Sequence, residues 1–357
     1  QPPRNAPVAE RRPFSRTHHN VTVDDPYAWL EDENYPDVTD QDVLGYLNAE
    51  NDYFERWVAP HQPLVDTLFA ELKGRKPKAD QGVPYETDGY RYQWRFENGL
   101  QYRTWYRQPI ASSLTNEWDC FFDENGHAQG LDYFSLGSMS ISPDGQRLAY
   151  STDSSGAERY TLRVLDLTSA EELCAPVENT AGKAVWNSAS DELLYLTVND
   201  QWRPNRLFLK KLQQQSDNSS DALLYEEHDP AFFLGMGVSQ SQALVLVASG
   251  DHVTSEVRLL PRFDFSANFT MVAPRETGHE YDVDHQGDAA DLGRLLIRSN
   301  QRHANFDIFE TPIATPTQQH WSLLVEGDEH TYITGHLSYR EAFFVQQRID
   351  GLDALSV

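Results

Sequence analysis

The feature that most constrains this fold is a repeated order of short strands and turns in the last three quarters of the chain. The stretch "SMSISPDGQRLAYSTDSSGAERYTLRVLDL" predicts a short strand, a turn at PDG, a strand, a second turn and a third strand. The same order returns further along. Equivalent positions at Ile141, Val185, Val238, Val283 and Gly335 are separated by 44, 53, 45 and 52 residues. A repeat of this length with about four small strands predicts a β-propeller.

A β-sandwich is the competing fold, because it is also built of short strands, but it has no reason to repeat one order at a near-constant period. Blade one is expected over residues 82–135, four more reach about residue 330, and a sixth stops at Val357. About five and a half blades would leave the edge strands of an unclosed propeller open. We therefore expect a mainly β protein with an incomplete propeller over residues 76–357.

The N-terminal region, residues 1–75, has a different pattern. Residues 1–20 are polar and contain Pro and Arg, and we expect a loosely attached arm there. Two helices should follow, the first capped by Thr39 or Asp40 and the second starting near Pro63 and stopping at Gly74. Their apolar stripes are formed by Val43, Leu44, Leu47, Phe54, Trp57 and Val58, and by Leu64, Val65, Leu68, Phe69 and Leu72.

No further long helical pattern follows, and the next stretch, "YRYQWRFENGLQYRTWYRQ", indicates a hairpin of two aromatic-rich strands around Asn98-Gly99.

Composition limits the compartment and the partners. No run approaches the roughly 18 apolar residues that span a bilayer, and the first residues lack the apolar core of a signal peptide. Cys120 and Cys174 are the only cysteines, which gives no disulfide framework and suits a reducing compartment. We expect a soluble cytoplasmic protein that does not associate with membranes.

The net charge of −26 argues against a nucleic-acid partner, because phosphates require clustered cations. The same charge could concentrate cationic ligands in a cleft, or could simply be a solvated acidic surface.

Motifs for catalysis are missing from the sequence. There is no Gly-x-Ser-x-Gly, the 12 histidines lack metal-ligand spacing, and no glycine-rich loop precedes a helix. The nearest approach to a nucleophile motif, "GVSQS" around Ser239, is typical of a turn. We therefore expect no catalytic residue, metal or cofactor within this chain.

Charged residues at one loop are the remaining candidates. The stretch "STDSSGAERYTLRV" groups Asp153, Glu158, Arg159 and Arg163 around a turn. Glu158 could accept a hydrogen bond from a cationic group such as a peptide amino terminus or an Arg side chain. An ordinary surface hairpin with its own ion pairs is the competing interpretation. The candidate substrate-binding residues are Asp153, Glu158 and Arg163.

Several stretches together resemble the prolyl oligopeptidase family of serine peptidases, and in particular its oligopeptidase B branch. They cover nearly the whole chain from about residue 10, and they are "DDPYAWLED", "VLGYLNAENDYFE", "ELKGRKPKADQGVPYETDGYRYQWRFENGLQY", "RPNRLFLKKL", "VAPRETGHEYDVDHQGD" and "NFDIFETPI".

This resemblance implies an enzyme in which a seven-bladed propeller, open between its first and last blades, covers an α/β-hydrolase domain. The Ser, Asp and His triad lies in that domain, so this chain alone should be inactive. The propeller would admit only oligopeptides, cleaved after Arg or Lys. "GAERY" would place Glu158 where the family holds the N-terminal side of the substrate.

The resemblance also implies that the N-terminal helices pack on the hydrolase domain, with contacts from Tyr27, Trp29, Phe54 and Trp57. Two rival hypotheses stay open. The parent could be a prolyl oligopeptidase that cuts after proline, or the chain could be a non-catalytic propeller that serves as a protein-interaction platform.

Overall fold

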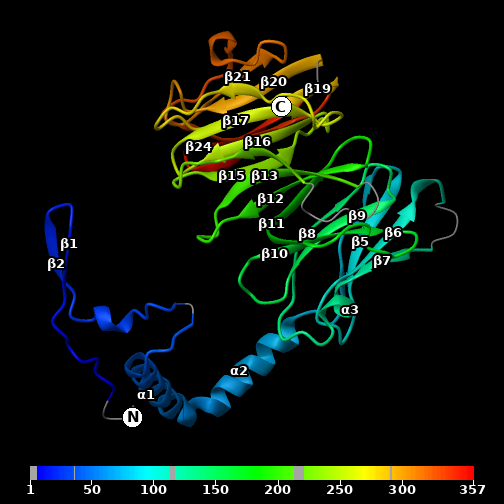
Figure 1. Ribbon diagram of the computed structural model, residues 1–357. Coiled ribbons are helices and arrows are strands. Elements are labelled where there is room, and N and C mark those ends of the chain that lie inside the picture. Colours follow the sequence, from blue (N-terminus) through cyan, green and yellow to red (C-terminus); the bar gives the residue numbers. More distant parts are fainter. Residues whose placement is uncertain (1–5, 36, 113–116, 213–220, 290–291) are drawn as a thin grey trace. The chain divides into compact units, whose positions relative to one another are not determined.

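The protein divides into two compact units, Gln1–Lys78 and Ala79–Val357 (Figure 1). The computed structural model describes residues 6–35, 37–112, 117–212, 221–289 and 292–357. From the sequence we expected the boundary at residue 75. Each unit is described by itself below.

Unit 1 combines a small hairpin with two helices. Strands β1 (Ser15–His18) and β2 (Val21–Asp24) pair antiparallel, within the region where we expected an arm without regular structure. All eight strand residues are exposed, so this hairpin buries no apolar face that the sequence analysis could have looked for. The other elements of the unit are η1 (Ala28–Leu30), α1 (Gln41–Val58), η2 (Ala59–His61) and α2 (Gln62–Arg75).

Both helices lie where the sequence predicted them. The Asp40 carboxylate accepts hydrogen bonds from the backbone N–H groups of Asp42 (2.8 Å) and Val43 (3.2 Å), which confirms the predicted cap of α1. The predicted stop at Gly74 is wrong, because Gly74 is still helical and the chain becomes extended at Lys76.

The apolar stripes of these helices have few partners inside unit 1. Val43 is the only described residue of α1 that is buried, and α2 contains no buried residue.

Unit 2 is built of antiparallel strands in successive sheets. The strands are β3 (Asp80–Gln81), β4 (Tyr85–Thr87), β5 (Tyr90–Phe96), β6 (Thr104–Pro109), β7 (Asp119–Asp123), β8 (Ser135–Ile141), β9 (Arg147–Asp153), β10 (Tyr160–Asp166), β11 (Val177–Trp186), β12 (Glu192–Val198), β13 (Pro204–Lys211), β14 (Ala222–Glu226), β15 (Phe233–Val238), β16 (Leu244–Gly250), β17 (Ser255–Pro261), β18 (Thr270–Ala273), β19 (Tyr281–Ala289), β20 (Leu292–Ser299), β21 (Asp307–Pro312), β22 (Ser322–Val325), β23 (Thr331–Ser338), β24 (Phe343–Ile349) and β25 (Leu352–Ser356). Short helices η3 (Ile110–Ser112), α3 (Glu124–Ala128) and η5 (Gln318–His320) lie in the connections.

The predicted repeat is confirmed by the strand order. Ile141, Val185, Val238, Val283 and Gly335 all lie on the first strand of their units, which are β8, β11, β15, β19 and β23. First strands of neighbouring blades lie against one another, as β8 does against β11 and β11 against β15. This arrangement is the β-propeller that we predicted. The predicted hairpin also forms, since β5 pairs with β6 across Gly99, whose φ is +90°.

One strand belongs to two blades. Strand β11 pairs with β10 at Val177 and Thr180, and it pairs with β12 at Thr180 and again from Ala184 to Trp186. Gly182, with φ +89°, lies at the irregularity between Thr180 and Ala184. The second and third blades therefore form one continuous sheet of seven strands, β8 to β14, instead of two separate four-stranded sheets.

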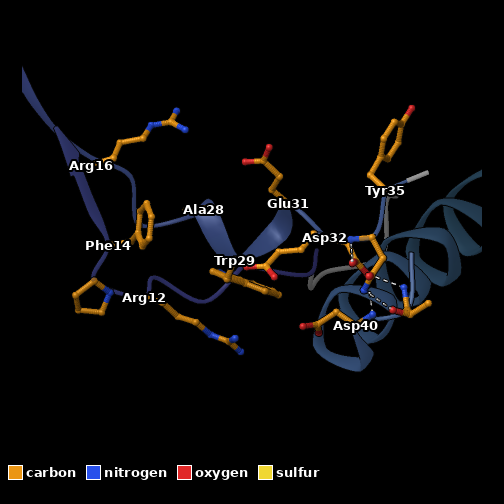
Figure 2. A pocket seen from close by; sticks show the side chains of 13 residues that line it. Arg12, Phe14, Arg16, Ala28, Trp29, Glu31, Asp32, Tyr35 and Asp40 are labelled. Carbon is orange, nitrogen blue, oxygen red and sulfur yellow. Dashed lines mark hydrogen bonds between the residues drawn. The ribbon is translucent and has the colours of Figure 1, made fainter. Parts of the chain in front are cut away.

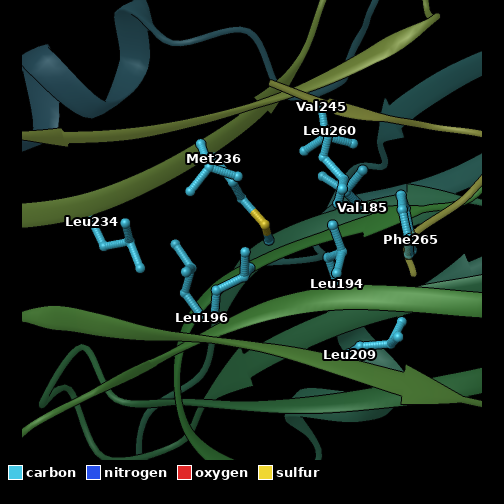
Figure 3. Close-up of a cluster of buried hydrophobic side chains, with 11 residues drawn as sticks. Val185, Leu194, Leu196, Leu209, Leu234, Met236, Val245, Leu260 and Phe265 are labelled. Atoms are coloured by element: carbon cyan, nitrogen blue, oxygen red, sulfur yellow. The ribbon is translucent and has the colours of Figure 1, made fainter. Parts of the chain in front are cut away.

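The core lies between blades, as Figure 3 shows for the third and fourth. Alternate positions of facing strands supply it, because side chains of a strand point in turn to its two faces. Its buried members are Val185, Leu194, Leu196, Leu207, Leu209, Leu234, Met236, Val245, Val247, Leu260 and Phe265.

Candidate functional site

The loop that joins β9 to β10 contains two of the three predicted site residues. Asp153 is buried, and its carboxylate accepts hydrogen bonds from the backbone N–H groups of Ser155 (2.8 Å), Gly156 (3.1 Å) and Glu158 (2.8 Å) and from the Ser155 hydroxyl (2.8 Å). Burial alone would raise the pKa of Asp153, but these hydrogen bonds together lower it below the usual range. All of these hydrogen bonds shape the loop.

Glu158 lies at the end of this loop with its side chain exposed. Its φ of +56° is in the left-handed region, which is costly for a residue with a Cβ, and the hydrogen bond from its N–H to Asp153 helps to hold it there. No hydrogen bond or ion pair joins the Glu158 carboxylate to another described residue. The structure thus brings Asp153 and Glu158 together, and the Asp153 carboxylate holds the backbone at Glu158.

A neighbouring loop of the third blade holds the Glu158 loop in place. The Arg159 guanidinium donates to the carbonyl oxygens of Asn199 (3.0 Å) and Asp200 (3.2 Å) and lies 4.4 Å from the centre of the Trp202 ring. The Trp202 indole N–H donates to the Ala157 carbonyl oxygen (2.5 Å). Trp202, which is 46% exposed, was missed in the sequence analysis, although an aromatic residue in the polar stretch "NDQWRPN" is a usable signal.

Arg163, the third predicted residue, is directed elsewhere. It lies on β10, where its Nε is 3.2 Å from Glu172 Oε1 and its Nη1 donates to the Thr152 hydroxyl (3.3 Å). The structure therefore does not direct Arg163 to the exposed Glu158 carboxylate.

An ion network of two buried glutamates and one half-buried arginine joins the third blade to the fourth. Arg275 Nη2 lies 2.5 Å from Glu227 Oε2 and 3.1 Å from Glu256 Oε1, and its guanidinium is 4.0 Å from the Phe232 ring centre. Burial would raise the pKa of Glu227, but the hydrogen bonds from Arg275 and from the Asp229 N–H outweigh it and lower the pKa to about 2.

Unit 1 has a pocket of its own, with a volume of about 870 Å³ (Figure 2). Asp32 lies in its wall and accepts hydrogen bonds from the N–H groups of Asn34 (2.8 Å), Thr39 (2.6 Å) and Asp40 (2.7 Å). The hydrogen bonds from Asp40, Asn34 and Thr39 lower the pKa of Asp32. This carboxylate orders the start of α1.

The four aromatic residues that we expected on a domain interface differ in their surroundings. The Trp29 indole N–H donates to the Glu10 carbonyl oxygen (2.8 Å), and its ring lies 4.3 Å from Arg12 Cζ, so unit 1 itself engages this side chain. Tyr27, Phe54 and Trp57 are 41%, 62% and 43% exposed.

Within the described ranges, no group of three or more His, Cys, Asp or Glu residues could hold a metal ion, and no helix has the length and apolarity to cross a membrane. Cys120 is exposed, Cys174 is buried, and both are free thiols.

Comparison with known proteins identifies the class to which this propeller belongs. Residues 6–357 match the family model described as "Prolyl oligopeptidase, N-terminal beta-propeller domain". The chain therefore belongs to the prolyl oligopeptidase family.

Its relatives include dipeptidyl aminopeptidase BI from Pseudoxanthomonas mexicana, with 30% identity over 98% of this chain and 49% of the relative. Protease 2 from Moraxella lacunata is 29% identical over 98% of this chain and 50% of that protein. The chain thus spans about half the length of the curated relatives it matches.

Two solved structures of oligopeptidase B have the same fold. The Leishmania major enzyme matches with a TM-score of 0.87 and 25% identity, and the closed form from Trypanosoma brucei with covalently bound antipain matches with 0.85 and 26%. Each comparison covers 98% of this chain and 50% of the solved chain. This confirms the resemblance predicted from the sequence motifs.

Proposed function

We propose that this chain is the N-terminal and propeller portion of a serine oligopeptidase similar to oligopeptidase B, which hydrolyses short peptides after Arg or Lys. The observation that carries this proposal is the match over 98% of the chain to two oligopeptidase B structures. The catalytic triad would lie in an α/β-hydrolase domain outside these residues, so the 357-residue chain alone should not cleave peptides.

The propeller would contribute binding and size selection. Glu158 supports this role because its carboxylate is exposed, has no partner among the described residues and is fixed by the Asp153 turn. A carboxylate in this position can pair with a peptide amino terminus or a basic side chain. Asp153 would act only by positioning Glu158, and Arg163 remains a weaker candidate because it is engaged by Glu172.

The net charge of −26 also favours the approach of cationic peptides. We further infer that the enzyme works in the cytoplasm, because two free cysteines suit a reducing compartment.

Unit 1 would be a docking surface for the hydrolase domain. This role is supported by the exposure of Tyr27, Phe54 and Trp57 and of the apolar stripe of α2, whose members are 43–65% exposed, because contact of apolar side chains with water is unfavourable. Trp29 would contribute less than we expected, since Glu10 and Arg12 already contact it.

A second candidate function is the removal of dipeptides from peptide amino termini. The 30% identity to dipeptidyl aminopeptidase BI favours it, and the Glu158 carboxylate could hold the free amino group of such a substrate. Cleavage after proline and a non-catalytic interaction platform are less well supported, because no contact of the described residues favours either of them.

Hydrolysis of Arg-ending fluorogenic peptides tests these functions. The substrates carry either a free or an acetylated amino terminus, and the enzymes are this chain and the longer product of its reading frame, each with and without a serine-directed inhibitor. We expect inhibitor-sensitive cleavage by the longer product only, with both peptides. Cleavage confined to the free amino terminus would favour the dipeptidyl aminopeptidase, and no cleavage by either product would favour the platform.

Variants of the longer product then test Glu158. Glu158→Gln removes the charge and keeps the shape, and it should raise KM several-fold for basic peptides while kcat changes little. Glu171→Gln, an exposed glutamate of the same blade, is the matched control. Equal KM values for Glu158→Gln and the wild type would remove Glu158 from the substrate site.

A further inference from the structure

A second pocket lies between the first blade and β8, the first strand of the second blade. Its volume is about 380 Å³, large enough for one aromatic residue and its flanking peptide groups. Side chains from β4, β5, β6 and β7 form its first-blade wall, and Leu136, Met139 and Ile141 of β8 lie opposite. Nothing in the peptidase chemistry proposed above uses this pocket.

The first-blade wall is aromatic and well ordered by its own contacts. The Tyr85 and Tyr92 rings stack with their centres 5.6 Å apart, and Phe121 meets Tyr92 edge-on at 5.8 Å. Trp105 is fixed by a hydrogen bond from its indole N–H to Glu124 Oε1 (2.7 Å). Tyr85 is 53% exposed, so its ring can meet a further ring in the stacked or edge-to-face geometry that aromatic pairs prefer.

Tyr92 is the unusual member of this wall. Its side chain is 1% exposed, and its hydroxyl has no hydrogen-bond partner in the part of the chain that the structure describes. A buried hydroxyl without a partner is destabilising, so the presence of Tyr at this position instead of Phe needs an explanation. Burial raises the pKa of Tyr92 to about 12, so the group stays protonated near neutral pH and can donate.

A second unpaired donor lines the same pocket. The Arg103 guanidinium lies 4.5 Å from the centre of the Trp94 ring and makes no hydrogen bond or ion pair to another described residue. Asp88 also lines the pocket, and its charge disfavours a carboxylate nearby. Two donors and a neighbouring acid suit neutral acceptors, and the carbonyl oxygens of a peptide are such acceptors.

We propose that this pocket binds an aromatic residue of a peptide, with the ring against Tyr85 and Trp105 and the peptide carbonyl groups accepting hydrogen bonds from the Tyr92 hydroxyl and Arg103. The inference deepens the proposed peptidase function, on which it rests for the identity of the ligand. It adds a subsite for aromatic residues within the wall of the propeller, remote from the Glu158 loop in sequence and independent of charge on the substrate.

Binding of a capped residue to the 357-residue chain tests this subsite without any catalysis. The probe is N-acetyl-4-fluorophenylalanine N-methylamide, which carries one ring and two carbonyl groups, followed by ¹⁹F line broadening. We expect saturable binding that excess N-acetylalanine N-methylamide does not displace. Thr87→Trp should abolish it, because Thr87 is an exposed residue of the pocket lining and a large ring there fills the entrance.

Tyr92→Phe isolates the hydroxyl. We expect about five-fold weaker binding, the usual effect of one hydrogen bond, together with a melting temperature equal to or above that of the wild type. Tyr106→Phe is the matched control, since its hydroxyl donates to Glu97 (2.9 Å) and the residue is not part of the pocket lining.

Two outcomes overturn the inference. Unchanged probe affinity in Tyr92→Phe would remove the hydroxyl from recognition, and absence of saturable binding, or equal displacement by the alanine compound, would remove the subsite. Neither outcome touches the hydrolysis experiment, so this inference and the peptidase proposal can fail separately.

Discussion

The two units differ in how far their apolar side chains are exposed. On α2, Leu64, Leu68 and Leu72 are 58%, 48% and 61% exposed, whereas on β16 Leu244, Val245 and Val247 are at most 2% exposed. Helix α2 has the apolar spacing of an amphipathic segment, whereas β16 begins with a continuous apolar run that is buried on both of its faces. The difference is the partner, because each propeller blade covers its neighbour while unit 1 is too small to cover its own helices. An apolar face therefore predicts that burial is needed without saying which part of a protein provides it.

The largest loss of stability should come from shortening an apolar side chain that is buried between two blades. Leu194→Ala removes a fully buried side chain from the core between the third and fourth blades, and we expect a loss of about 3 kcal/mol in the free energy of unfolding. The matched change on the uncovered face, Leu68→Ala, should alter it by no more than about 0.5 kcal/mol. Urea unfolding of both variants checks this, and equal losses would contradict the contrast between the units.

The ion network between the third and fourth blades should give the next largest effect. Glu227→Gln leaves Arg275 with Glu256 alone, and we expect a loss of about 2 kcal/mol at neutral pH. Because the folded-state pKa of about 2 lies below the ordinary 4.5, the wild-type carboxylate stabilises the fold above pH 4.5. That contribution is lost as the pH falls from 4.5 toward 2.

The variant should therefore show a flatter dependence of stability on pH over this acid range. Glu326→Gln, at an exposed ion pair with Arg302, is the control and should behave like the wild type. A Glu227→Gln curve parallel to the wild-type curve would show that this carboxylate does not couple folding to protonation.

The smallest effect concerns the start of α1. Asp40→Ala removes the acceptor of two backbone N–H groups and should cost about 1 kcal/mol of local stability. Hydrogen exchange should accelerate in the first turn of α1 and remain unchanged in the propeller strands. Asp37→Ala, at an exposed position before the cap, is the control. Equal exchange in both variants would mean that the cap contributes nothing.

Most of the fold could be predicted because its signals are local. Turn residues and strand spacing located the first strands of the blades, and the Asp40 cap located α1. The shared strand β11 could not be predicted, since it depends on Thr180 pairing with both β10 and β12, which no spacing along the chain signals. The hairpin at residues 15–24 was missed because all of its strand side chains are exposed.

The candidate site was less predictable because a residue type does not show how its atoms are used. The sequence grouped Asp153 with Glu158, but only the structure shows that the Asp153 carboxylate bonds to its own loop. Arg163 belongs to an ion pair with Glu172, which lies on a neighbouring segment. The pocket at Tyr92 depends on two blades that meet in space, and no spacing along the chain signals it.

The central claim is that the apolar face of α2 has no covering partner among the described residues of unit 1 and, as proposed above, gains one from a hydrolase domain. Hydrogen exchange of the α2 amides, measured in the 357-residue chain and in the longer product of its reading frame, tests it most directly. We predict fast exchange in the shorter protein, strong protection in the longer one, and equal protection of the propeller strands in both. Slow exchange of α2 in the shorter protein, or no gain of protection in the longer one, would contradict the claim.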